Sequence, residues 1–477
     1  MYMHLSSKSQ LRSRLIIIVL ALLAGMLLPG ALSAMEGQAS KPELPQVGVP
    51  LVPAPLNSTA PPVTITFKDA LTRAGRNYPQ YLSALSDAKL AHEDTVQARA
   101  ALLPSLGYTQ QYIGTEGNGK LASGRFVTQD GVHVYRAWGV FHQEMPAGFF
   151  TLSPYRRAQA SEALAQAKAE LARRGLVVTV TQAYYGYITA QRKYATAQQV
   201  FAVVDRFFRD TTLDELKGEK ARSDVVKAQL QLDQQRQVVQ DAQLAVQNAQ
   251  IALAVLLSPT LNLNFVAVDD MDHMPSLPPF EKVQSLTERQ NQDVKAAFAA
   301  FQQAKSDVTV AIASFFPTMS VDTDYGIEAN ALALRSTVAA AKRLGPLPNP
   351  GYFITASLNI PIWNWGTTLS KLRQAEHKSN QAQVELTQAQ REALRNLYAY
   401  YDDASTSRAE ADMLRDAAGL AAESLRLTTL RYQGGEATAL EVIDAQNTLA
   451  AARNTYADGQ MRYRVALATL QNLTGSF

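Results

Sequence analysis

The chain has 477 residues, no cysteine and a formal net charge of +3. The lack of cysteine excludes a disulfide framework, a thiol nucleophile and a cysteine metal site. Three basic residues near the start, Lys8, Arg12 and Arg14, equal that charge, so the remainder is close to neutral. It does not have the basic character that nucleic-acid binding requires.

Residues 1–34 have the pattern of a secretory signal peptide. The basic residues precede an apolar run, Leu15–Leu28, which is about half the length needed to span a bilayer. We expect cleavage after Ser33 or Ala34, with an uncleaved anchor as the alternative. Residues 35–62 are rich in proline and predict an extended tether without a core of its own.

A first set of elements is predicted between residues 63 and 259. The alternation that starts at Leu106 indicates a strand, and the unbroken pattern from Pro154 to Leu216 indicates a helix of roughly 90 Å. The expected order is helix, strand, glycine-rich loop, strand, long helix, turn and helix. The first helix is expected at Phe67–Leu103, the first strand from Leu106, the glycine-rich loop at Gly114–Gly131 and the second strand at Val132–Met145. The long helix is expected at Pro154–Leu216, the turn at Gly218 and the last helix at Ala221–Leu257.

The same order recurs in residues 280–477, after a predicted linker at 260–279. Phe280 corresponds to Phe67, and Phe316-Pro317-Thr318 corresponds to Leu103-Pro104-Ser105. Two tandem repeats, 63–259 and 280–477, are therefore expected.

The second repeat has clear periodic patterns. Its strands alternate apolar and polar residues, and its long helix is predicted at Thr367–Leu430. The last helix has small and apolar residues at coiled-coil spacing, so another helix should pack closely against it. These residues are Ala445, Leu449, Ala452, Tyr456, Gly459, Tyr463, Ala466, Leu470 and Leu473.

Four strands per chain are too few to close a barrel, which needs about eight or more. The alternation is typical of transmembrane β-strands, although a soluble hairpin has a similar pattern. Open strand edges are not tolerated in a membrane, so we expect an oligomer. Two copies would supply eight strands and three copies would supply twelve.

The order of elements, the Leu-Leu-Pro-Ser-Leu segment at 102–106 and the segment Tyr432–Gln446 together resemble the TolC family of outer-membrane efflux proteins. The resemblance implies a mainly α-helical homotrimer with a 12-stranded transmembrane β-barrel in the outer-membrane lipid of a Gram-negative bacterium. A long α-helical barrel would extend into the periplasm. Such a channel serves a tripartite efflux pump or a type I secretion system, docks to a periplasmic adaptor and an inner-membrane transporter, and has no enzyme activity or cofactor.

The resemblance also assigns an acidic ring at the periplasmic entrance to Glu441 and Asp444. Their spacing of three places both on one helical face. In a trimer, six such carboxylates would attract cations and raise one another's pKa. The alternative for a bare Glu-x-x-Asp pair is a solvated helix face.

Ser223, Asp224 and Tyr432 match family positions that close the entrance. An arginine of TolC that helps to lock the closed state falls on Ala437, so we expect a different closure here. Arg222 and Arg431 lie nearby in the sequence as possible substitutes.

The tips of the two helical hairpins correspond to the family's adaptor-contact region, although their glycines also suit a tight turn. They comprise Gly218, Glu219, Lys220, Gly435, Glu436 and Ala437.

The alternative function from a different class is a secreted or periplasmic coiled-coil protein, structural or adhesive, without a pore.

An enzyme is disfavoured because no catalytic triad, metal cluster or cofactor loop is found. The segment Gly114–Lys120 has neither the hydroxyl residue nor the strand-to-helix setting of a phosphate-binding loop. The cluster Met271–Met274 lies in the predicted linker and is interpreted as a chance grouping. Asp322 and Asp324 are interpreted as ordinary hydrated residues of a lumen.

Overall fold

The computed structural model describes residues 61–115, 132–146, 152–218, 221–259, 261–329, 337–338, 347–348, 350–434 and 436–475. The predicted signal peptide (1–34) and almost all of the predicted extension (35–62) lie outside these ranges. Within the ranges the elements in chain order are β1 (Val63–Ile65), α3 (Phe67–Asn77), α4 (Pro79–Ala100), β2 (Ser105–Thr115), β3 (Val132–Pro146), α5 (Ser153–Leu216), α6 (Arg222–Leu257), β4 (Phe265–Ala267), α7 (Phe280–Gln290), α8 (Gln292–Ala313), β5 (Thr318–Ala329), β6 (Thr337–Val338), β7 (Leu347–Pro348), β8 (Gly351–Asn359), α9 (Thr367–Gln433) and α10 (Ala439–Thr474).

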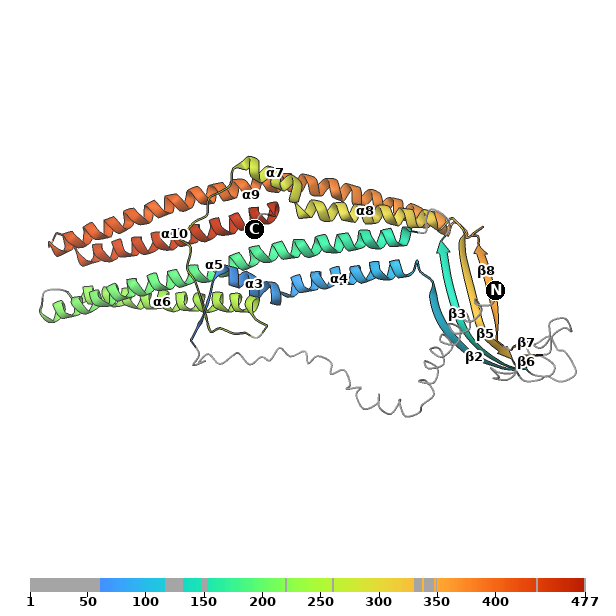
Figure 1. The fold of residues 1–477 in the computed structure, drawn as a ribbon. Coiled ribbons are helices and arrows are strands. Elements are labelled where there is room, and N and C mark those ends of the chain that lie inside the picture. The colour runs from blue at the N-terminus through green and yellow to red at the C-terminus, as the bar shows by residue number, and fades with distance from the viewer. Residues whose placement is uncertain are drawn as a thin grey trace, which may run out of the picture. The chain divides into compact units, whose positions relative to one another are not determined.

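The long helices form two hairpins, α5–α6 and α9–α10, and α10 also packs along α5 (Figure 1). Helix α4 lies beside α5, and α8 lies beside both α5 and α9. The long helix predicted to end at Leu216 is confirmed, and α9 continues three residues beyond the predicted Leu430. With 64 and 67 residues, α5 and α9 are each roughly 100 Å long.

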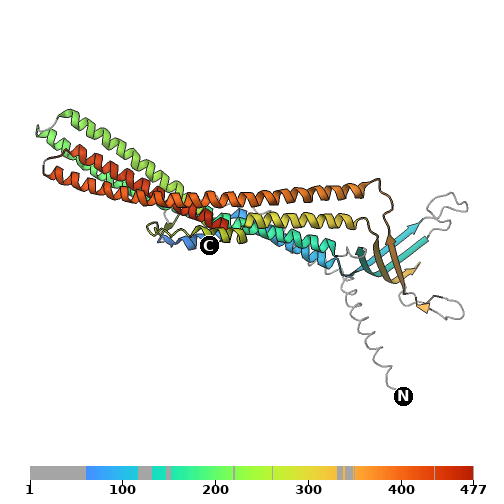
Figure 2. The same cartoon turned by 90° about the horizontal axis from the view of Figure 1, so that it is seen from above.

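A four-stranded sheet lies at the ends of α4, α5, α8 and α9 that are remote from the hairpin turns (Figures 1 and 2). None of the helices in the described ranges combines the length and the apolar character that would let it cross a membrane.

The single helix predicted at Phe67–Leu103 is wrong, because the chain breaks at Tyr78. This residue is extended, with φ −74° and ψ 114°, and α4 starts at Pro79. The ring of a proline disfavours helical geometry in the residue before it, whereas proline itself suits the first position of a helix. A similar break separates α7 from α8 at Asn291, whose side chain accepts a hydrogen bond from the Val294 amide at 2.9 Å.

The prediction that residues 260–279 form a simple linker also needs correction. Strand β4 pairs in parallel with β1, from Val63 opposite Phe265 to Ile65 opposite Ala267. The following residues 268–275, here called the strap, contact both α5 and α10. Met271 in the strap is fully buried, whereas Asp272 and His273 are exposed, so the cluster Met271–Met274 contributes one residue, Met271, to the packed core.

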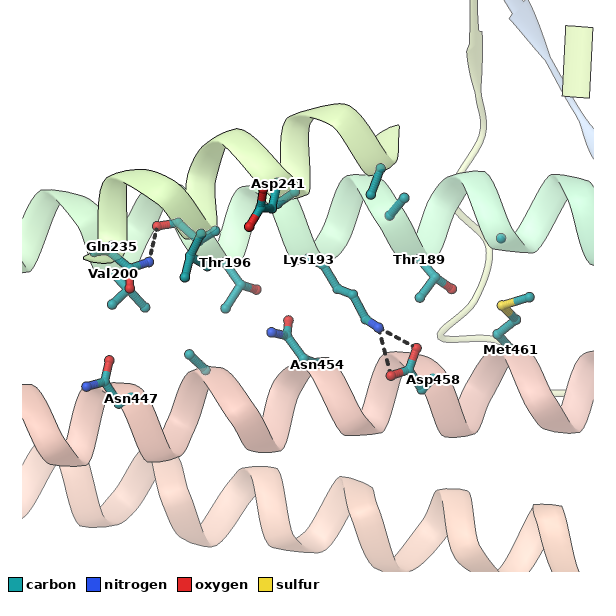
Figure 3. Close-up of a pocket in the computed structure, with 17 residues that line it drawn as sticks. Thr189, Lys193, Thr196, Val200, Gln235, Asp241, Asn447, Asn454, Asp458 and Met461 are labelled. Carbon is teal, nitrogen blue, oxygen red and sulfur yellow. Dashed lines mark hydrogen bonds and ion pairs between the residues drawn. The ribbon is translucent and has the colours of Figure 1, made fainter. Parts of the chain in front are cut away.

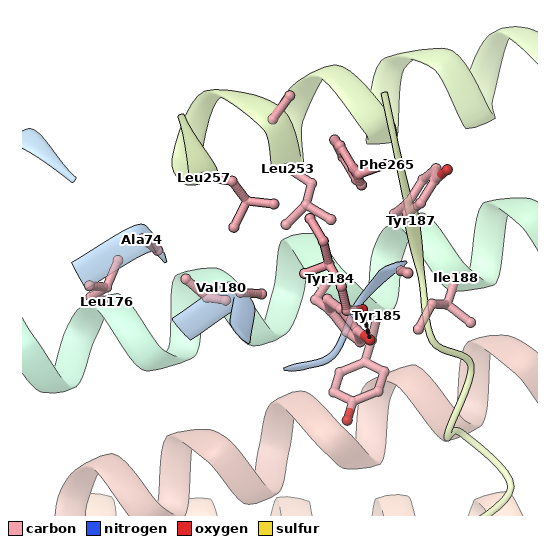
Figure 4. Close-up of a cluster of buried hydrophobic side chains, with 14 of the residues drawn as sticks. Ala74, Leu176, Val180, Tyr184, Tyr185, Tyr187, Ile188, Leu253, Leu257 and Phe265 are labelled. Atoms are coloured by element: carbon pink, nitrogen blue, oxygen red, sulfur yellow. Dashed lines mark hydrogen bonds between the residues drawn. The ribbon is translucent and has the colours of Figure 1, made fainter. Parts of the chain in front are cut away.

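The largest buried cluster surrounds the middle of α5, where α3, α6 and the β1–β4 pair converge (Figure 4). Tyr184 and Tyr185 are almost fully buried and meet edge to face, with ring centroids 5.3 Å apart. The Tyr184 hydroxyl donates to the Val268 carbonyl at 2.8 Å. Aromatic residues can contribute large apolar areas to a core while their polar ends remain hydrogen-bonded.

The coiled-coil spacing predicted for α10 is confirmed by its packing against α9. Leu449, Gly459 and Tyr463 are all buried. A Cβ atom added to Gly459 would lie 2.8 Å from the Leu414 Cδ1 atom and 3.6 Å from the Ala411 Cα atom. Glycine therefore permits the close approach of the two helices at this point.

The sheet has the strand order β2-β3-β5-β8, and all neighbours are antiparallel. Its register places alternate residues of every strand on a common face. One face, here called the apolar face, includes Leu106, Tyr108, Tyr112, Tyr135, Phe141, Met319, Val321, Tyr325, Ile327, Tyr352, Ile354 and Leu358. The alternation predicted for β2, β5 and β8 is confirmed, and the register adds the faces of β3.

Among the strand side chains that the structure describes, every charged one lies on the opposite face, here called the charged face. These are Arg136, Glu144, Asp322, Asp324 and Glu328. The register also brings oppositely charged groups together. Arg136 contacts Glu328 at 2.9 Å, and His142 contacts Asp322 at 2.6 Å. Strands β2 and β8 are the two edges of the sheet.

Candidate functional site

The residues assigned to the entrance lie near the turns of the two helical hairpins. Gly218 ends the α5 side of the first turn with φ +80°, a backbone conformation that glycine adopts without strain. Glu436 and Ala437 precede α10, at the second turn. Glu219, Lys220 and Gly435, which were predicted to contact an adaptor, lie outside the described residues.

Glu441 caps the start of its own helix. The Thr438 amide donates to the Glu441 Oε1 atom at 3.0 Å, and the Glu441 amide donates to the Thr438 Oγ1 atom at 3.3 Å. This reciprocal capping box satisfies two amides that would otherwise have no partner at a helix start. The hydrogen bond from the Thr438 amide lowers the pKa of Glu441. Within one chain the shift is thus opposite to the rise expected from converging carboxylates.

Arg431 also engages Glu441. Its Nη1 atom lies 3.7 Å from the Glu441 Oε2 atom, and its Nη2 atom donates to the Glu436 carbonyl at 3.2 Å. Arg431 thereby links the end of α9 to the start of α10. At the other tip, Arg222 pairs with Glu215 at 3.3 Å. Each arginine named as a possible substitute in closure therefore has a partner within its own hairpin.

Asp444 differs from Glu441, one turn earlier on α10. Its side chain is exposed and has no hydrogen-bond or ion-pair partner among the described residues. Of the two acidic residues, Asp444 is therefore the one whose carboxylate is not engaged within the described part of the chain.

The three residues assigned to closure do not contact one another within the described part of this chain. Asp224 lies 3.9 Å from the Lys227 ammonium, and Ser223 is exposed. Tyr432, in the last turn of α9, is 43% exposed. Their role in closure remains a prediction.

Helix α10 is anchored to the first hairpin near the tips. Ile443 is 1% exposed and packs in a cluster with Val200 and Val204 of α5 and Leu232 of α6. Because Ile443 lies between Glu441 and Asp444 in the same turn, this packing fixes the position of the acidic residues relative to α5 and α6.

A groove of about 630 Å³ separates α10 from α5 and α6 beyond this anchor (Figure 3). It is lined by small and polar residues. Lys193 of α5 pairs across it with Asp458 of α10 at 2.7 Å. Elsewhere along the two helices, Arg453 of α10 donates to Gln199 of α5 at 3.1 Å. Polar, partly exposed contacts of this kind are weak, so they add little to the packing of α10 against α5.

The strap also holds the same two helices together. Arg192 of α5 donates to Asp269 at 2.8 Å, and Arg464 of α10 donates to the His273 carbonyl at 2.7 Å. Gln460 is fully buried and donates to the Met271 carbonyl at 3.2 Å. These contacts join residues far apart in the sequence, and no local motif indicated them. The capping box, by contrast, has the sequence signature Thr-x-x-Glu, which sequence reasoning missed.

Replacing Thr438 with alanine should loosen the first turn of α10, because the Glu441 amide loses its acceptor. An N-cap of this kind changes local stability enough for roughly fivefold faster amide exchange, which hydrogen–deuterium exchange mass spectrometry can detect. Thr448→Ala is the matched control, since among the residues that the structure describes the Thr448 hydroxyl bonds only the Asp444 carbonyl of its own helix, at 2.8 Å. Equal exchange in both variants would contradict a capping role.

The cap should also depend on pH. Because the folded-state pKa of Glu441 is lowered, its contribution is present above the ordinary pKa of a glutamate. The contribution is lost as the pH falls through the lowered value.

The family model described as outer membrane efflux protein matches residues 283–476. The outer membrane protein TolC of Vibrio cholerae is 24% identical over 411 residues, covering 85% of this chain and 89% of that protein. TolC of Escherichia coli is 22% identical and covers 83% and 80%.

Solved structures are similar in fold. The Campylobacter jejuni CmeC outer membrane channel superimposes with a TM-score of 0.72 at 16% identity, covering 86% of this chain and 85% of that one. The outer membrane protein VceC of Vibrio cholerae gives a TM-score of 0.70 at 18% identity, covering 86% and 96%.

Proposed function

Because this chain belongs to the outer membrane efflux protein family, we propose that it is the exit duct of a tripartite export system. It is an outer-membrane protein of a Gram-negative bacterium and extends into the periplasm. Three copies form the duct. The two repeats, 63–259 and 280–477, contribute equivalent halves of each copy.

The division of the sheet into an apolar and a charged face carries this proposal. The apolar face suits lipid, and the charged face suits a water-filled lumen. The edge strands β2 and β8 are open in one chain, and a membrane does not tolerate open edges. Pairing β8 of one copy with β2 of the next closes the sheet, and three copies give a 12-stranded barrel.

The helices supply the periplasmic part of the duct. At roughly 100 Å, α5 and α9 reach well beyond the sheet, and their hairpin tips carry the entrance residues. The tips meet a periplasmic adaptor, which connects the duct to an inner-membrane transporter. The duct is passive and performs no enzymatic reaction, so the energy for export comes from the transporter.

Cysteine cross-linking can test closure, since the natural chain has no cysteine. Tyr108→Cys on β2 should form a disulfide with a cysteine at one of four alternate β8 positions on the apolar face. These positions are Tyr352, Ile354, Ala356 and Leu358. Adjacent strands bring Cβ atoms within disulfide range, so denaturing electrophoresis should show covalent dimers and trimers.

A matched control combines Phe141→Cys with Ile354→Cys. Phe141 lies on β3, which β5 separates from β8, so no cross-link should form. Failure of every β2–β8 pair would reject the closed trimer and favour the secreted coiled-coil alternative.

A further inference from the structure

The charged face of the sheet contains a hollow of about 400 Å³. The floor of the hollow is formed by two paired glycines, Gly326 of β5 and Gly351 of β8. Because neither glycine has a side chain, the surface is recessed at these two positions. Gly326 cannot be replaced without distortion, because an added Cβ atom would overlap the Ala137 carbonyl oxygen. At Gly351 an added Cβ atom would meet no other atom within 4 Å.

Aromatic and acidic side chains surround this floor. Trp138 of β3 is the partner of Gly326 on one side. One row further along the strands, Asp324 is paired with Phe353 of β8. The hollow is therefore lined by Trp138, Phe353 and Asp324, together with Tyr352, Arg136 and Glu328.

Among the described residues that line the hollow, Arg136 is the one cation, and its charge is already compensated. The Arg136 guanidinium donates to Glu328 at 2.9 Å and to Gln111 at 3.2 Å. It also lies over the Trp138 ring, 5.3 Å from the centroid. Arg136 and Glu328 thus neutralise each other at the rim.

Asp324, in contrast, has no hydrogen-bond or ion-pair partner among the residues that the structure describes. Its neighbour on the same face, Asp322, contacts His142 at 2.6 Å. The two aspartates were interpreted alike from the sequence as hydrated residues of a lumen. The structure separates them, because only Asp324 lines the hollow.

We propose that this hollow binds organic cations that carry an aromatic ring. The Asp324 carboxylate compensates the positive charge, while the faces of Trp138 and Phe353 attract both the cation and the ring. This inference rests on the proposed duct, in which three such hollows line the lumen. They would give the duct a preference for aromatic cations among its cargo.

Tryptophan fluorescence of the detergent-solubilised full chain tests the site. The chain has three tryptophans, so Trp363→Phe and Trp365→Phe leave Trp138 as the only emitter. N-Benzylpyridinium, an aromatic cation whose pyridinium ring quenches indole emission, should quench Trp138 with a saturable dependence on concentration. Acrylamide, a neutral quencher, should quench without saturation.

Three variants of this background isolate the hollow. Asp324→Asn should weaken N-benzylpyridinium binding about tenfold, the scale of one charge contact in a partly desolvated site. Gly351→Leu should abolish saturable quenching by filling the hollow. Asp322→Asn, one row away and outside the hollow, should leave binding unchanged. Equal acrylamide quenching in wild type and Asp324→Asn confirms that Trp138 keeps its exposure.

Saturable quenching that persists undiminished in Asp324→Asn or Gly351→Leu would overturn the proposal. The mass of the complex, measured on the same sample, separates the two levels of inference. A trimer without saturable binding refutes the hollow as a site and leaves the duct standing. A monomer would refute both the duct and the placement of the hollow in a lumen.

Discussion

Replacing Arg174 with leucine should destabilise the helical part of the protein by about 3–5 kcal/mol, the usual loss when a buried charged group is removed from its partners. Arg174 is 5% exposed. Its guanidinium donates to Glu170 at 2.9 Å, to the Gln290 carbonyl at 3.1 Å and to the Asn472 carbonyl at 3.4 Å. The two carbonyls lie at the C-terminal ends of α7 and α10, where a positive charge is favourable.

Arg173 provides the matched control. It donates to the same glutamate, Glu170, at 2.7 Å, but its side chain is 45% exposed. Exposed ion pairs contribute about 0–1 kcal/mol, so Arg173→Leu should change stability little. Thermal unfolding followed by far-ultraviolet circular dichroism compares the two variants. Similar melting temperatures for both would show that Arg174 does not clamp α5, α7 and α10 together.

Replacing Asp444 with asparagine should raise the concentration of a trivalent cation that half-blocks the channel by about tenfold or more. In the proposed trimer three Asp444 carboxylates converge on the entrance, and their attraction for a multivalent ion adds up. Single-channel current in planar bilayers, with La³⁺ on the periplasmic side, measures the block.

Glu441→Gln is the informative comparison. Glu441 is already engaged by the Thr438 cap and by Arg431, so its replacement should weaken the block much less. If Glu441→Gln matched or exceeded the effect of Asp444→Asn, the capping contacts would not hold that carboxylate away from the ions. Block unchanged in both variants would remove the pair from the entrance.

Sequence periodicity predicted the long helices well, because their patterns are local and repeat over many turns. It placed the start of α5 at Pro154, and the helix begins at Ser153. It also predicted the apolar and polar faces of three strands. The break at Tyr78 was missed, although the proline that causes it was visible in the sequence.

The remaining features depend on contacts between distant residues. The strap joins Arg192 and Arg464 to residues 269–273 across separations that no sequence motif encodes. The hollow exists because Gly326 and Gly351 are paired, and only the strand register reveals that pairing. For the entrance, the resemblance supplied Glu441 and Asp444 as equals, and the structure distinguishes them by the partners of Glu441.

The most direct test of the proposed duct is the mass and shape of the complex extracted in detergent from the outer membrane. Mass measurement should give three chains per particle, and side views in electron microscopy should show a hollow helical shaft of roughly 100 Å. A water-soluble monomer, or a two-stranded rod without a cavity, would contradict the duct.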